Sequence, residues 1–213
     1  MFERVILLID DNPKTESIYK VSYERYIKEI QEQNEKYAHY KFEFKFFPDM
    51  KSAKEFMLKN NLVDVLVVDY DLGTGDIFQN GAEFIKFVRE NVNKQCRIIF
   101  YTMQEKHSIE TSELIAMINS DVYKMIDKAS NTKAISQIIF DAAIKCDPIV
   151  HSLENFFLKY KNILSVNSYT YESQEVTIDE IIAHIRMDDE MGRYFIDKIL
   201  YTSILSNIKI GEQ

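Results

Sequence analysis

Residues 65–76 read VLVVDYDLGTGD, an apolar run that ends in an aspartate. Asp71 follows Asp69 by two positions, and Gly73 and Gly75 come close behind. A short apolar run closed by a polar residue is typical of a buried strand that leads into a turn. Taken alone, Asp69 is compatible with a metal-binding loop, a phosphatase nucleophile, a phosphorylation site or a simple turn. Residues elsewhere in the chain are needed to distinguish between these alternatives.

Four further apolar runs of similar length occur earlier and later in the chain, at 5–9, 42–47, 98–101 and 122–126. The runs at 5–9, 65–68 and 98–101 are apolar throughout and do not alternate, which favours strands that are buried on both faces of a parallel sheet. Stretches with helical spacing of apolar residues separate them, at 13–37, 52–60, 81–92, 109–118 and 132–145. Strand and helix alternate five times. We therefore predict a doubly wound α/β domain with a five-stranded parallel sheet over residues 1–147.

The composition is that of an acidic globular protein. The chain has 213 residues, of which 46% are hydrophobic and 28% charged, and its formal net charge is -8. Nucleic acid and anionic membranes attract an excess of lysine and arginine, so neither is an expected partner. No segment reaches the ~18 apolar residues of a membrane span. Cys96 and Cys146 lack metal-site spacing and are predicted to be free thiols. We expect a cytoplasmic protein.

Polar side chains close four of the five predicted strands. They are Asp10 and Asp11 after the first, Asp69 after the third, Thr102 after the fourth and Lys128 near the fifth. In an open α/β sheet the carboxyl ends of the strands border one crevice, so these residues can converge. Three carboxylates need a counter-ion, and Mg²⁺ prefers oxygen ligands. A lysine and a hydroxyl beside them suit a phosphate, whose oxygens accept hydrogen bonds from both.

This ordered set resembles the response-regulator receiver domain of two-component signalling, which is CheY-like. The matching stretches are ILLIDDNP at 6–13, VLVVDYDL at 65–72, IIFYT at 98–102 and VYKMIDK at 122–128. The resemblance covers residues 1–147 and implies the flavodoxin-like strand order 2-1-3-4-5. It also implies a histidine kinase or a phosphotransfer protein as a partner.

The resemblance assigns a role to each residue of the set. Asp69 would accept the phosphoryl group as a carboxylate nucleophile. Lys128 would pair with Asp69 or with the phosphoryl oxygens, and Thr102 would bond the phosphoryl group. The Mg²⁺ ligands would be the carboxylates of Asp10, Asp11 and Asp69 and the backbone carbonyl of Asp71. Any enzymatic activity would be limited to phosphorylation and dephosphorylation of the chain itself.

Further positions either add to these roles or depart from the usual receiver sequence. Asp71 and Gln104 occupy positions that tune self-dephosphorylation in receivers. Ala129 follows the lysine, where receivers usually have proline. Met125 stands where the switch aromatic normally lies, and Tyr123 would face the same side in a regular strand. The segments that follow Asp11 and Asp69 are longer than the family norm. These departures favour an altered output, while the phosphorylation chemistry is expected to be intact.

There are three alternatives to phosphorylation of Asp69, and the sequence does not support them equally. An EF-hand loop that starts at Asp69 would place Gly73, Thr74 and Asn80 at ligand or turn positions that they do not suit, so it is excluded. A haloacid-dehalogenase-like phosphatase would use Asp69 as nucleophile and Asp71 as general acid. In that family the motif belongs to the first strand of the core, whereas here two predicted strands precede it. A pseudo-receiver scaffold that never takes phosphate remains a third alternative.

Residues 148–213 do not continue the alternation of strand and helix. We predict a helix at 150–164, an extended or looped stretch at 167–174 and a helix that begins with the capping box at Thr177 and Glu180. A last helix follows the acidic run at 188–190. A DNA-reading segment would be rich in lysine and arginine, and this one is not. We therefore expect a helical extension for protein interaction or homodimerisation.

Overall fold

The chain divides into two compact units. The computed structural model describes residues 2–59, 61–72, 77–102 and 109–210. One unit comprises residues 1–90 and 96–146, and the other comprises residues 91–95 and 147–213.

The first unit is built on a parallel sheet of five strands in the order β2-β1-β3-β4-β5. The strands are β1 (Phe2–Ile9), β2 (Tyr40–Phe47), β3 (Val65–Asp69), β4 (Arg97–Thr102) and β5 (Val122–Asp127). All five predicted strands and the predicted doubly wound order are therefore confirmed. Every residue of β3 is buried, which explains why its sequence is apolar up to Asp69.

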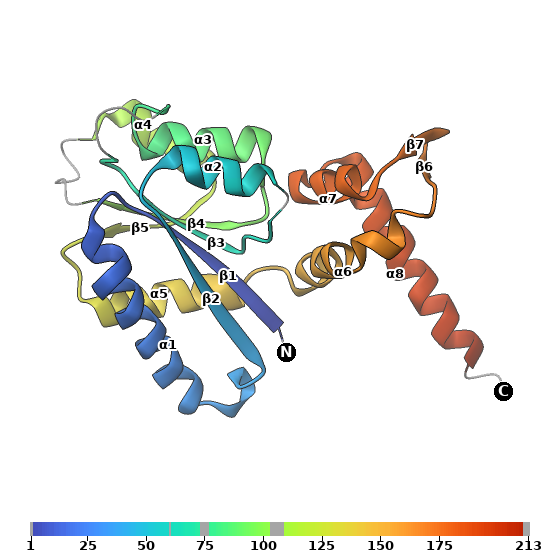
Figure 1. The fold of residues 1–213 in the computed structure, drawn as a ribbon, viewed down its shortest axis with the longest axis horizontal. Coiled ribbons are helices and arrows are strands. Elements are labelled where there is room, and N and C mark those ends of the chain that lie inside the picture. The colour runs from blue at the N-terminus through green and yellow to red at the C-terminus, as the bar shows by residue number, and fades with distance from the viewer. Residues whose placement is uncertain (1, 60, 73–76, 103–108, 211–213) are drawn as a thin grey trace. The chain divides into compact units, whose positions relative to one another are not determined.

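Helices cover both faces of this sheet. Figure 1 shows α2 (Met50–Leu58), α3 (Gly81–Asn91) and α4 (Thr111–Asn119) on one face, with α1 (Val21–Glu32) and α5 (Thr132–Ile144) on the other. The stretch 13–37, predicted as one long helix, consists of a π-helical segment η1 (Thr15–Lys20), α1 and a 3-10 turn η2 (Glu35–Tyr37). The stretch is therefore helical over most of its length, as predicted, and its irregular first segment begins shortly after the acidic pair.

A buried ion pair fixes β1 against the start of β3. The Arg4 guanidinium lies 2.8 Å from a carboxylate oxygen of Asp64, and both side chains are buried. The other oxygen of Asp64 accepts the backbone N–H of Val5 at 2.7 Å, and the Asp64 N–H donates to the Val5 carbonyl. Because a buried charge must be paired and hydrogen-bonded, this arrangement disfavours a shift in register between the two strands.

Strand β5 is irregular where Tyr123 lies. The register against β4 shifts between Ile98 and Ile99, so that Ile98 pairs with Val122 and Ile99 with Lys124. Tyr123 consequently packs against the core cluster of the α1 and α5 face, to which Ile126 also belongs. A bulge of this kind reverses the alternation of side chains along a strand. The expectation that Tyr123 shares a side with Met125 holds only for a regular strand and does not apply here.

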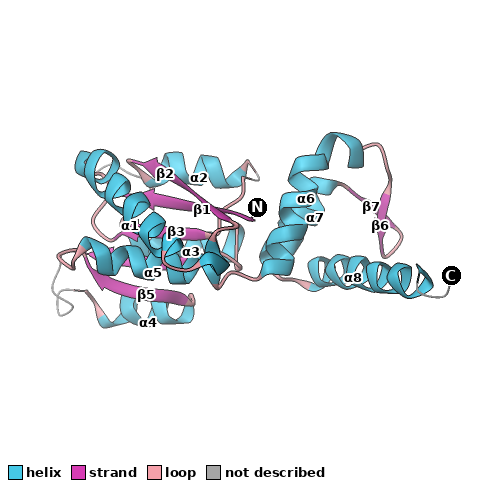
Figure 2. Cartoon of the chain, turned by 90° about the horizontal axis from the view of Figure 1, so that it is seen from below, coloured by secondary structure: helices cyan, strands magenta, loops and turns pink. Residues whose placement is uncertain are grey.

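The second unit is mostly helical. It contains α6 (Pro148–Leu164), β6 (Tyr169–Tyr171), β7 (Gln174–Val176), α7 (Ile178–Met187) and α8 (Glu190–Ile210). The stretch at 167–174, predicted to be extended or looped, forms most of a two-stranded antiparallel hairpin, which Figure 2 shows in magenta. Thr177 and Glu180 form the predicted capping box. Isoleucines of α7 lie at the centre of an apolar cluster with Phe157 of α6 and Phe195 of α8.

Two sequence-based expectations can be compared directly with this fold. Among the described residues, no helix is both long and apolar enough to cross a membrane. Cys96 and Cys146 are both buried free thiols, as predicted. Burial raises the pKa of Cys146 to about 12, so this thiol is unreactive at neutral pH.

Candidate metal centre at the carboxyl edge of the sheet

The register of the sheet brings the acidic strand ends together. Ile9 is paired with Val68 across β1 and β3, so Asp10 follows directly beside Asp69. On the other side of β3, Asp69 is paired with Tyr101 of β4. Because all the strands are parallel, each ends at the same edge of the sheet.

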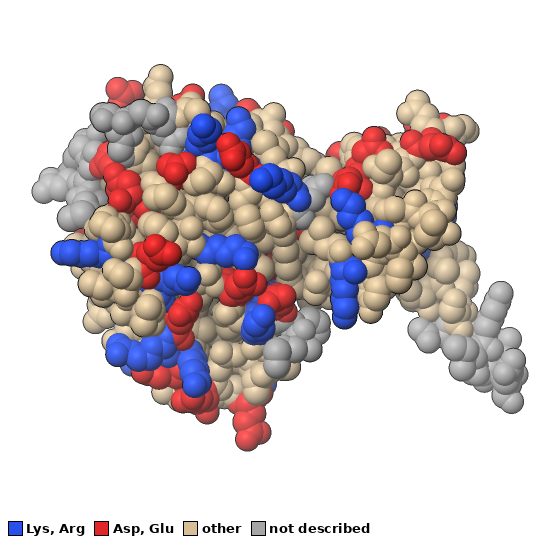
Figure 3. All heavy atoms as spheres, viewed as in Figure 1, with Lys and Arg blue, Asp and Glu red and all other residues tan. Residues whose placement is uncertain are grey.

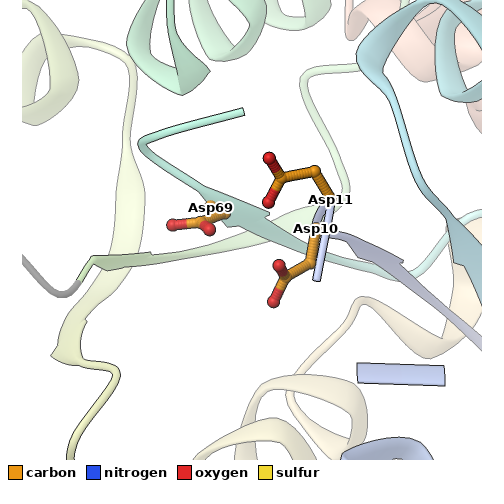
Figure 4. A group of neighbouring side chains, drawn as sticks. All are labelled: Asp10, Asp11 and Asp69. Carbon is orange, nitrogen blue, oxygen red and sulfur yellow. The ribbon is translucent and has the colours of Figure 1, made fainter. Parts of the chain in front are cut away.

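Three carboxylates crowd this edge. Asp10, Asp11 and Asp69 each offer an oxygen atom, and these atoms all lie within 4.8 Å of one another. Asp10 and Asp69 are buried, whereas Asp11 is exposed. Figure 4 shows the side chains of Asp10 and Asp11 leaving the end of β1 in different directions, with Asp69 beside them on β3. Carboxylates at such distances repel each other unless a cation neutralises them.

Lys128 brings a positive charge into this cluster. Its Nζ lies 2.6 Å from Oδ2 of Asp69 and 3.0 Å from Oδ2 of Asp10, and its side chain is only 12% exposed. The lysine follows β5, and its backbone N–H donates to the carbonyl of Thr102. Asp127 shapes the turn by accepting the N–H of Ala129 at 2.8 Å. The predicted lysine therefore reaches the acidic group without the proline that usually follows it in receivers.

Asp10 is held by donors that the sequence did not reveal. Its Oδ2 accepts a hydrogen bond from Thr15 Oγ1 at 2.6 Å and another from the hydroxyl of Tyr101. Its Oδ1 accepts the backbone N–H of Asn12 at 2.9 Å and a hydrogen bond from Lys128 at 3.1 Å. Both oxygens of this fully buried carboxylate are thus engaged. Asp10 is an anchor that fixes the lysine and the start of η1.

Burial changes the protonation of the site. Desolvation raises the pKa of Asp69 to about 6, although the hydrogen bond from Lys128 opposes the rise. Burial lowers the pKa of Lys128, but its hydrogen bonds to Asp69 and Asp10 outweigh this, so the pKa is raised overall. The hydroxyl of Tyr101 also has a pKa well above its ordinary value, because it is buried beside Asp10. At neutral pH Asp69 is an anion that lacks full solvation.

The backbone of Asp69 is approached closely by α3. A Cβ on Gly81 would lie 2.2 Å from the carbonyl oxygen of Asp69, a separation that no side chain can adopt. The N–H of Gly81 donates to the carbonyl of Tyr70 at 3.0 Å. Glycine is therefore required where the chain returns from the loop into α3.

Of the remaining predicted site residues, the structure describes Thr102 and Asp71. Thr102 is buried at the end of β4, and Asp71 is exposed, with its backbone N–H hydrogen-bonded to the Asp69 carboxylate. Gln104 and residues 73–76 lie outside the described residues. Lys128, Asp10 and Asp69 meet directly, and Asp11 lies beside them.

Comparison with known proteins finds similar folds among solved structures. No family model and no curated protein sequence matches the chain. A CheY-like response-regulator receiver domain from Methanospirillum hungatei is similar at 15% identity with a TM-score of 0.48, covering 67% of this chain and 97% of its own. A response-regulator receiver domain protein from Clostridium thermocellum gives 15% identity and a TM-score of 0.47, with coverages of 67% and 95%.

The strand order decides the fold. A parallel sheet ordered β2-β1-β3-β4-β5, with helices on both faces, is the CheY-like arrangement. The unit of residues 1–90 and 96–146 therefore has the CheY-like fold, and we call it the receiver unit. The carboxyl edge of this receiver unit carries the acidic pair, the central aspartate, the threonine and the lysine.

The receiver unit suits a divalent cation at this edge. Every candidate ligand of the group is a carboxylate oxygen, as Mg²⁺ prefers. Asp10 accepts hydrogen bonds from four donors on its two oxygens, so it would need more rearrangement than Asp69 to hold a metal. Asp10 would contribute its negative charge and the position of Lys128.

Proposed function

We propose that the chain is a phosphorylation-dependent signalling switch in which Asp69 accepts a phosphoryl group in the presence of Mg²⁺. The proposal is carried by one observation, the contact of Lys128 with both Asp69 and Asp10 beside the exposed carboxylate of Asp11. This cluster brings together a carboxylate that can act as a nucleophile, a lysine cation and carboxylate oxygens of the kind that bind a metal ion.

The chemistry follows from these positions. Oδ2 of Asp69 accepts from Lys128, so Oδ1 is the oxygen that would attack the phosphorus of a donor. A bond forms between this oxygen and phosphorus, while the bond between phosphorus and the donor's leaving group breaks. Bound Mg²⁺ would neutralise charge on the phosphoryl oxygens. Lys128 would then move its hydrogen bond to a phosphoryl oxygen, and Thr102 would bond another.

Transfer would convert a singly charged carboxylate into a group with roughly two negative charges at neutral pH. The donors that hold Asp10 and Asp69 would be redistributed, and β4 and β5 would shift with Thr102 and Lys128. A histidine kinase or a phosphotransfer protein would be the phosphodonor. Residues 148–213 would carry the output through protein contacts, in the cytoplasm. Figure 3 shows acidic and basic side chains interspersed on the visible face of the receiver unit, which offers no basic stripe there for nucleic acid.

The test is incubation of the full chain with acetyl phosphate and Mg²⁺, followed by measurement of the intact mass. We expect a gain of one phosphoryl group that requires Mg²⁺, is lost on chelation before transfer and is absent in Asp69→Asn. Asp71→Asn serves as the matched control and should still be labelled. No gain with several phosphodonors would favour a pseudo-receiver scaffold. Steady release of phosphate from a phosphomonoester, dependent on both Asp69 and Asp71, would favour the haloacid-dehalogenase-like phosphatase.

A further inference from the structure

The second unit contains a groove between two of its helices. Helix α7 packs against both α6 and α8, and the groove lies between the latter two, with a volume of about 640 Å³. Its apolar lining comes from residues of all three helices, including Leu153, Phe156, Ile181 and Ile199. Among its described lining residues there is no acid, and Lys198 is the one cation. We call it the tail groove.

One wall of the tail groove is a short apolar stripe on α6. Leu153 and Phe156, three residues apart, line the groove, and Phe156 is 48% exposed. The backbone angles of Tyr160 are not helical, so a kink interrupts α6 beyond this point. The α6 stripe therefore presents exposed apolar surface to the groove.

A second apolar stripe lies on α8. Phe195 and Ile199 pack into the cluster around α7, but Tyr194, Tyr201, Ile204 and Leu205 are exposed. Figure 1 shows the C-terminal half of α8 running on beyond α6 and α7. The 21 residues of α8 span roughly 30 Å, so this half projects by several turns. An isolated helical segment of this length is marginal in water and gains stability when its apolar face is covered.

We propose that the tail groove receives the α8 stripe of a second copy of this chain, so that two chains form a symmetric dimer through α6 and α8. An apolar helix would fill the groove, and α8 of a second copy has an apolar stripe that the described part of its own unit leaves exposed. In a two-fold dimer each copy gives its α8 stripe and receives its partner's, so both exposed surfaces are covered at once.

The available area meets the lower limit for a specific dimer. Phe156 and the four residues of the α8 stripe are each between 38% and 66% exposed. Taken together they leave on the order of 500 Å² of surface per chain, with ~200 Å² for a whole side chain. Two chains would therefore bury roughly 1,000 Å², the smallest area expected of a specific interface.

Charge also favours this occupant. The whole chain carries a net charge of -8, so two copies repel each other over most of their surfaces. The tail groove has no acid among the lining residues that the structure describes, and Lys198 is the one cation among them. The four residues of the α8 stripe are uncharged, but the exposed Asp197 lies on the same helix face, three residues after Tyr194 and four before Tyr201. Contact through this pair of surfaces therefore brings an acid toward a groove whose charged lining residue is a lysine. The inference goes beyond the proposed phosphorylation of Asp69 and does not depend on it.

The experiment measures the mass of the full chain in solution by light scattering and sedimentation, without a phosphodonor. Interfaces of about 1,600 Å² have dissociation constants of about 1 µM or below, and this smaller one should still hold the wild-type chain mainly as a dimer at about 100 µM. Phe156→Glu, at the groove, and Tyr201→Lys, on the α8 stripe, should each give monomers. Ile118→Glu, at an exposed position of α4 in the receiver unit, is the matched control and should remain dimeric.

Mixing the two tail variants provides a second measurement. In a mixed dimer one groove and stripe are both unaltered, and the other pair brings the glutamate introduced in one variant against the lysine introduced in the other. Heterodimers should therefore form where neither variant dimerises alone. A wild-type monomer at about 100 µM would overturn the proposal and leave the groove to a different protein. Dissociation by Ile118→Glu alone, or a mixture that stays monomeric, would also overturn it. Thermal melts of each variant by circular dichroism establish that both units remain folded.

Discussion

Lys128 and Asp69 are joined by a hydrogen bond of 2.6 Å between side chains that lie 59 residues apart in the chain. The same ammonium group also reaches Asp10, so one cation balances two buried carboxylates. The position of Lys128 is set by the end of β5, where its backbone N–H is bonded to the carbonyl of Thr102. The electrostatic balance of the site therefore depends on the register of the whole sheet.

Removal of this cation should destabilise the receiver unit. In Lys128→Met the carboxylates of Asp10 and Asp69 lose their resident counter-charge, and breaking a buried ion pair costs about 3–5 kcal/mol. Since a divalent cation can replace part of the lost charge, Mg²⁺ should stabilise the variant more than the wild type. Urea unfolding with Mg²⁺ and with chelator measures both effects. Lys124→Met, at an exposed position of β5, is the control, and equal responses of the two variants would contradict the assignment.

The hydroxyl of Tyr101 should contribute to stability through Asp10. Tyr101→Phe keeps the buried ring but removes a donor to a buried carboxylate, and hydrogen bonds to charged groups are worth about 1.5–3 kcal/mol. Tyr123→Phe is a matched control, because its hydroxyl accepts only a long, exposed hydrogen bond of 3.3 Å from Lys145 among the interactions described. Chemical denaturation compares the two. A loss at Tyr101 no greater than at Tyr123 would show that Asp10 does not depend on the phenol.

The fold and the acidic edge could be read from the sequence because each rests on a local pattern. Apolar runs such as that before Asp69 identify strands buried on both faces, and the parallel rule then places their polar ends at one edge. The same rule predicted that Asp10, Asp69 and Lys128 would meet. None of these steps requires knowledge of which residue pairs with which.

The features that the sequence did not reveal depend on exact register. Tyr101 belongs to an apolar run and looks like a core residue, and only its pairing with Asp69 shows that its hydroxyl reaches the acidic edge. Thr15 contacts Asp10 from the first position of η1, a π-helical segment whose geometry has no reliable sequence pattern. The bulge that turns Tyr123 toward the α1 and α5 face has no local signal either.

Gly81 should tolerate no side chain. In Gly81→Ala the new methyl group would overlap the carbonyl oxygen of Asp69, so α3 or the end of β3 must move. We expect a loss of several kcal/mol, as for other strained or overpacked positions, and a displaced Asp69. Thermal unfolding gives the first effect, and amide chemical shifts around Asp69 give the second. Ala82→Ser, one residue further along α3, should leave both nearly unchanged, and a wild-type-like Gly81→Ala would refute the close approach.

Neutralisation of Asp69 should stabilise the chain at neutral pH. The pKa of this carboxyl is about 6 in the folded chain and 3.8 as an ordinary value, so between these limits the folded state binds more protons than the unfolded state. The stability contributed by the protonated group is complete below pH 3.8 and is lost as pH rises through 6. The shift corresponds to on the order of 2–3 kcal/mol. Asp69→Asn has no carboxyl group to titrate at this position and does not lose this stability. Its free energy of unfolding should therefore increasingly exceed that of the wild type between about pH 4 and about pH 7.

Urea unfolding in the presence of chelator, at several pH values across this window, tests the prediction. Chelator is needed because a bound cation would stabilise the wild-type anion and hide the effect. The exposed Asp71→Asn serves as the control and should follow the wild-type pH dependence. The opposite trend, in which Asp69→Asn loses ground as the pH rises, would mean that Lys128 stabilises the Asp69 anion by more than burial costs it.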